Sequence, residues 1–183
     1  RKTVARAHDL IFGFCSYHGK KMMGSTWRKE AEKDKLNEAE RAMQLISWVF
    51  TAIAAWFLLS HWTEDTGFFT SEFGQLDALV LFGPLLFGLL PPLVRTLRGR
   101  KNISRPWDIV GSMLFVLSSA YFLCVFPFDM AFFAVPLPDG MRFLIDWVTE
   151  DIAKVVLVIG IAGGVLGIGW TTLTYFKVKE ILE

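Results

Sequence analysis

Residues Val155–Gly169 read VVLVIGIAGGVLGIG, and no side chain in this stretch is charged. A helix on the surface of a soluble domain needs a polar face, and a helix of this composition has none. The apolar stretch extends over residues 155–176, and three more occupy residues 43–61, 78–94 and 109–126. A helix needs about 20 predominantly apolar residues to cross the hydrocarbon core of a bilayer. The sequence therefore predicts an all-α membrane protein, a bundle of four transmembrane helices.

The charges outside these stretches separate by sign. Residues 1–43 contain ten Lys and Arg against six Asp and Glu, and the tail after the fourth span begins with Lys177 and Lys179. Residues 95–105, which follow span two, carry five basic side chains and no acidic one: Arg95, Arg98, Arg100, Lys101 and Arg105. The loops after spans one and three are acidic instead. Because short loops rich in Lys and Arg stay in the cytoplasm, we expect both termini there, and these five side chains at the inner lipid headgroups.

The chain before the first span divides at Gly24-Ser25-Thr26. Residues 1–24 predict a basic amphipathic helix that lies either on the inner leaflet or packed under the bundle. Residues 25–42 predict a charged cytoplasmic helix that continues directly into span one, and residues 43–183 form the transmembrane domain. Residues 141–148 place apolar side chains on one helical face, which predicts an outer interfacial helix or an outward extension of span four.

Small residues recur at helical spacing in spans three and four. In span four they are Gly160, Gly163, Gly164, Gly167 and Thr171, which form pairs four residues apart. Span three offers Ser112 and Ser119 as part of a matching stripe. Small residues at this spacing let membrane helices approach closely. The stripe fits packing of spans three and four within one chain, and it also fits a contact between copies or the lining of a pore.

Span two contains Pro84, Pro91 and Pro92, and because proline removes a helical donor we expect a kink or a break there. Interrupted helices line substrate sites in some transporters. No ionisable side chain lies deep in any predicted span, which argues against a proton-coupled transporter, a pump or a voltage sensor. A channel gated by a hydrophobic constriction is not excluded.

Metal-capable side chains come near one another in only one place, where His61, Glu64 and Asp65 end span one. A zinc site needs more His or Cys ligands at fixed spacing, so interfacial hydrogen bonding is the favoured role for this group. The glycines lie in the middle of a span with no preceding strand, unlike a phosphate-binding loop. We therefore expect no catalytic residues, no cofactor and no nucleic-acid partner.

Three classes of function fit these patterns. The first is a non-catalytic subunit or scaffold that associates through its Gly-rich fourth span and its cytoplasmic N-terminal helices. The second is a homo-oligomeric ion channel or facilitator, because four spans are few for a conducting path within one chain. The third is a membrane-embedded enzyme, which rests on the His61 group alone. The expected partners are the lipid bilayer and either further copies of the chain or other membrane subunits.

Overall fold

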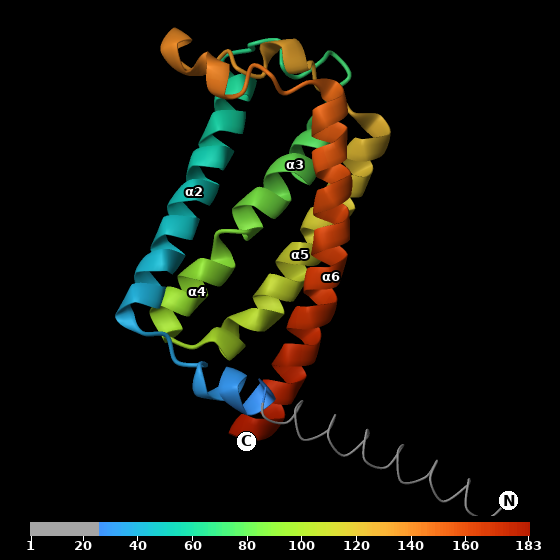
Figure 1. Ribbon diagram of the computed structural model, residues 1–183. Helices are drawn as coiled ribbons and strands as arrows, with labels where there is room; N and C mark the ends of the chain where they lie inside the picture. Colours follow the sequence, from blue (N-terminus) through green and yellow to red (C-terminus); the bar gives the residue numbers. More distant parts are fainter. Residues whose placement is uncertain (1–25) are drawn as a thin grey trace, which may run out of the picture.

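The computed structural model describes residues 26–183, which are all-helical (Figure 1). Four segments are long and apolar enough to cross a membrane, as helix α2 (Glu38–Thr63), the pair α3 (Gln75–Phe87) and α4 (Leu90–Arg98), α5 (Lys101–Val125) and α6 (Glu150–Leu182). Two short 3-10 helices, η1 (Met130–Phe132) and η2 (Asp139–Leu144), lie between α5 and α6. The all-α class and the number of long apolar helices are confirmed, and they indicate an integral membrane protein. The amphipathic segment predicted for residues 1–24 lies outside the described residues.

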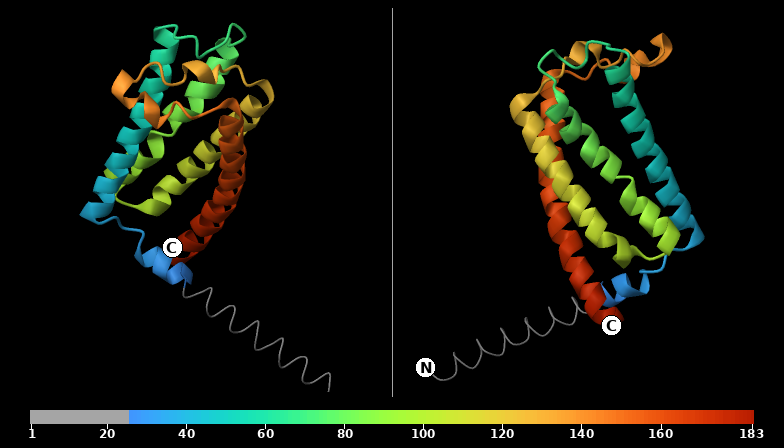
Figure 2. Two further views of the ribbon diagram at one scale, coloured as in Figure 1. Left: turned by 45° about the horizontal axis from the view of Figure 1, so that its top comes forward. Right: turned by 180° about the vertical axis from the view of Figure 1, so that it is seen from behind.

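Helices α2 and α6 stand at opposite edges of the molecule, with α3, α4 and α5 between them (Figures 1 and 2). Helix α6 packs along α5, whereas α2 packs mainly on α4 near one end. No extensive interface joins α2 to α6. The four spans therefore form an open arrangement in which the two outermost helices flank the middle ones without closing on each other.

Span two is broken between α3 and α4, in the turn formed by Gly88 and Leu89. Pro84 lies inside α3, and because it has no N–H it leaves the carbonyl of Val80 without a helical donor. The Ser118 hydroxyl of α5 donates to that carbonyl at 2.8 Å, so the helix passes Pro84 unbroken. Pro91 lies in the first turn of α4, where a helix needs no N–H donor.

The charged segment before span one is not one continuous helix. Residues 26–32 are helical, the chain then turns, and α2 begins anew after Asn37. The Asn37 side chain accepts from the N–H of Glu40 at 2.8 Å, and the Glu40 carboxylate accepts from the N–H of Asn37 at 3.1 Å. This reciprocal capping box starts a helix at Glu38, so the expected direct continuation into span one is wrong.

The turn before α2 is bound to the start of α5. The Asp34 side chain accepts from the N–H of Asn102 at 2.7 Å, and the Asp34 carbonyl accepts from the N–H of Lys101 at 2.8 Å. Glu30 lies 3.5 Å from the guanidinium of Arg105. Nearer the start of the same segment, Trp27 contacts Trp170 of α6, with 5.7 Å between the ring centroids. Residues 26–36 are thus part of the folded unit at this end of the helices.

At the opposite end, the loop between α2 and α3 packs against the loop after α5. Phe69 and Phe128 form an isolated β-bridge, and Phe68 between these loops is only 4% exposed. The predicted α-helix over residues 141–148 is absent: η2 is a 3-10 helix that ends at Leu144, and a turn follows before α6. Thr149 caps α6 through its hydroxyl, which explains why this helix starts as an independent element.

Candidate functional site: a mainly apolar cavity between the helices

A cavity of about 440 Å³ lies between the spans and is bordered by α2, α3, α4, α5 and α6. Its volume falls within the range of about 300–1,000 Å³ typical of small-molecule sites. Leu58, Leu81, Phe115 and Leu157 give it mainly apolar walls. The break in span two also borders it, through Gly88. The cavity is thus formed where the helices fail to pack closely.

One face of α5 brings polar side chains to this cavity. Asp108, Ser112 and Ser119 line it, and Ser104 lies one turn before Asp108. At about 100° per residue, the four positions fall within about 80° of one another around the helix. A polar line therefore runs along α5, from the end near Lys101 toward the middle of the helix.

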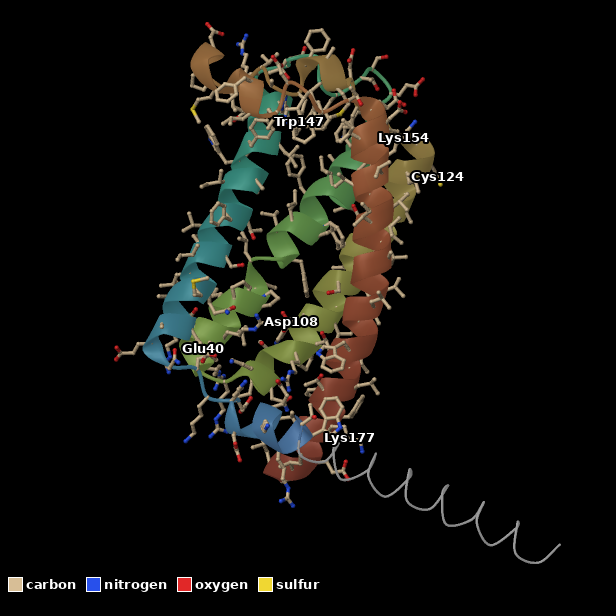
Figure 3. The ribbon with its side chains drawn as sticks, in the orientation of Figure 1. Glu40, Asp108, Cys124, Trp147, Lys154 and Lys177 are labelled. Atoms are coloured by element: carbon tan, nitrogen blue, oxygen red, sulfur yellow. The ribbon has the colours of Figure 1, made fainter. Side chains whose placement is uncertain are left out.

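Arg95 of α4 binds the Asp108 side chain that lines the cavity. Its guanidinium forms an ion pair with Asp108 at 2.5 Å, donates to the Ser104 hydroxyl at 2.7 Å and to Gln44 of α2 at 3.0 Å. Three helices are tied together by this one side chain. Figure 3 shows Asp108 on α5 facing the interior of the molecule beside α4.

Asp108 is the residue that sequence reasoning missed. Span three was predicted to begin at residue 109, but α5 begins at Lys101, so Asp108 lies about 10 Å along the helix. Helices α4 and α5 extend beyond the predicted spans and include three ionisable side chains near the turn that joins them, Arg95, Asp108 and Arg105. The four-residue spacing of Ser104, Asp108 and Ser112 was the available signal, because it continues the serine stripe of the predicted span.

The five basic residues expected at lipid headgroups do not share one environment. Arg95 pairs with Asp108, Lys101 lies 2.5 Å from Glu40, and Arg105 binds the Asn102 side chain at 2.8 Å. Only Arg98 and Arg100 are exposed, with no ion pair formed to any residue in 26–183. The surface available to lipid phosphates at this end is therefore smaller than the sequence suggested.

The glycines of α6 fall into two sets. A Cβ added at Gly164 would lie 2.5 Å from Cγ2 of Val116, and one at Gly160 would lie 3.2 Å from the Phe115 ring, so both glycines face α5 closely. Gly163 and Gly167 have no such neighbour within 4 Å. Thr171 is half-buried. Gly160 and Gly164 therefore form a contact within the chain. Gly163 and Gly167 form an uncovered edge of α6.

His61 is 1% exposed and is held as part of the aromatic packing. Its Nδ1 lies 2.6 Å from the Thr66 hydroxyl, and its Nε2 lies 3.2 Å from the carbonyl of Phe133. The Nε2–H therefore donates to that carbonyl while Nδ1 accepts from the hydroxyl. Glu64 and Asp65 are exposed, and within residues 26–183 no three His, Cys, Asp or Glu side chains gather as a metal site.

The polar groups of the cavity are few and lie on α5 and α2. The cavity offers a carboxylate with a balancing guanidinium at one end and serine hydroxyls along an otherwise apolar wall. Comparison of the chain with protein-family models, with curated proteins and with solved structures finds no match.

Proposed function

We propose that this protein is a non-catalytic integral-membrane subunit, a four-span bundle with both termini in the cytoplasm, that associates laterally through α6. The partner is a second copy or another membrane subunit. The observation that carries this proposal is the uncovered edge of α6 at Gly163 and Gly167. The charge distribution around the spans supports the orientation.

Uncovered glycines on a membrane helix favour contact with another helix more than exposed apolar side chains do. An exposed Leu or Val on a membrane helix is satisfied by acyl chains, so exposure alone says nothing about partners. Two glycines four residues apart leave a groove that a helix backbone can enter, which increases van der Waals contact between helices. Because α5 already covers Gly160 and Gly164, the second pair is available to another chain.

Residues 26–36 are not assigned to this lateral contact. Their hydrogen bonds to the start of α5 and the Trp27–Trp170 contact bind them to their own chain. Deleting this segment would therefore disturb the fold itself, and it is unsuitable as a test of partner binding.

The test is a comparison of leucine substitutions along α6. We expect the double variant Gly163→Leu/Gly167→Leu to lose its partner while keeping its melting temperature, because neither new side chain meets its own chain. The mass of particles extracted in a lipid-preserving polymer gives the assembly state. Gly169→Leu is the matched control, because this glycine is equally uncovered but lies away from the pair.

For Gly164→Leu we expect a change in stability before any change in assembly. Its side chain would collide with Val116, so we expect a lower melting temperature as the first effect. Unchanged particle mass in the double variant would contradict the proposal. A closed particle of three or more identical copies in the unmodified protein would instead favour the homo-oligomeric channel.

A further inference from the structure

We infer that the cavity between the spans binds a lipophilic alcohol, a neutral molecule with an apolar body and one hydroxyl group. The hydroxyl would donate to Asp108, and the body would lie along the apolar walls toward Phe122. This inference concerns a ligand site and does not depend on the lateral association through α6.

The first support is the unused half of the Asp108 carboxylate. Arg95 and Ser104 approach its Oδ2 atom, at 2.5 Å and 3.3 Å. No donor in the part of the chain that the structure describes forms a hydrogen bond to Oδ1. Because no buried side-chain oxygen in residues 26–183 lacks a partner, Oδ1 is an accessible atom of the carboxylate. A ligand that brings a donor to this oxygen gains a charge-assisted hydrogen bond.

The second support is the charge balance at this end of the cavity. Arg95 already neutralises Asp108, so a ligand cation would compete with the guanidinium and bring its own desolvation cost. A neutral hydroxyl donates to Oδ1 without disturbing the ion pair. The Ser112 hydroxyl also lines the cavity and suits an uncharged polar group, whereas the Thr51 hydroxyl already donates to the Ser47 carbonyl at 3.0 Å.

The third support is the route of entry. The cavity is partly open, and its two flanking walls belong to α2 and α6, which do not pack on each other. We expect a molecule dissolved in the bilayer to enter the cavity between these two helices. This route favours a lipophilic ligand over a water-soluble one.

The experiment uses the full chain in phosphatidylcholine vesicles with a photoreactive long-chain primary alcohol. We expect saturable labelling of α5 or α6 residues at the cavity. The methyl ether of the same probe, which cannot donate, should label at least about tenfold more weakly, because a hydrogen bond to a charged acceptor is lost. Equal labelling by the ether would overturn the inference, since the cavity would then hold any apolar chain. Stronger labelling by the matching amine would also overturn it, because the ligand would be a cation.

Two variants test whether the label occupies the cavity. Ser112→Leu fills it from α5 and Thr51→Leu fills it from α2, and each should abolish saturable labelling. Two positions on different helices are used so that a folding defect in one variant does not decide the result. Asp108 is left unchanged because its loss would release Arg95. Met113→Phe, on the exposed face of α5, is the control and should label normally. Labelling that survives both filling variants would overturn the inference.

Discussion

Arg95 links three helices through its side chain. Its guanidinium joins Gln44 of α2, Ser104 and Asp108 of α5, and its own helix α4. The Arg95 side chain is 26% exposed and the Asp108 side chain is 20% exposed. Removing one partner of such a pair leaves the other charge without compensation in a poorly hydrated place.

Arg95→Leu should therefore lower the free energy of unfolding by about 2 kcal/mol, less than for a fully buried pair because of the remaining exposure. The double variant Arg95→Leu/Asp108→Leu should recover at least about half of that loss. Denaturation in detergent micelles measures both. Arg98→Leu on the same helix is the control, since Arg98 is exposed and forms no ion pair within residues 26–183. A double variant no better than the single one would show that the pair contributes no coupling energy.

The same two residues show where sequence reasoning about the site ends. Hydropathy places span boundaries where the apolar run stops, and charged side chains at a boundary are assigned to the loop. Arg95 and Asp108 lie on different helices and compensate each other only after the α4–α5 turn brings them together. This tertiary pairing is what allows both to enter the helices, and periodicity within one span does not reveal it.

At the scale of elements, capping explains most differences from expectation. The apolar runs predicted the long helices well, because run length is the dominant signal for a span. Their ends moved outward: α2 begins at the Asn37 capping box and α6 at Thr149. Polar first turns of this kind extend a helix beyond its apolar run. The loss of the predicted helix over residues 141–148 has a related cause, since a 3-10 helix and a turn precede the cap at Thr149.

Asp34 caps the start of α5, although it lies outside that helix. Its side chain accepts from the N–H of Asn102, one of the donors that a helix start leaves without a partner. We expect Asp34→Ala to reduce the free energy of unfolding by about 1–2 kcal/mol, as for loss of an N-cap. Thermal denaturation of the purified protein measures this. Glu32→Ala, at an exposed position of the same segment, should change stability by no more than about 0.5 kcal/mol. Equal effects of the two substitutions would contradict the capping role.

For the whole molecule, the packing partners were harder to predict than the elements. A stripe of small residues on α6 predicts a close contact but not its partner, and here α5 takes Gly160 and Gly164 while Gly163 and Gly167 remain uncovered. The open arrangement follows from the break in span two, because α2 packs mainly on α4, the half of that span beyond the break. The cavity arises from this open packing of the helices, which no local sequence pattern predicts.

The orientation of the molecule gives a prediction at the same scale. Helix α2 starts and α6 ends at the same end of the molecule, where the basic connection also lies (Figure 1). We expect this end in the cytoplasm, because Lys and Arg in short loops resist translocation. In a variant with Cys15 and Cys124 replaced by serine, a membrane-impermeant maleimide should label Ser71→Cys in intact cells. Arg100→Cys and Glu183→Cys should react only after the cells are opened. The reverse pattern would invert the orientation, and labelling of positions 100 and 183 from different sides would contradict four crossings.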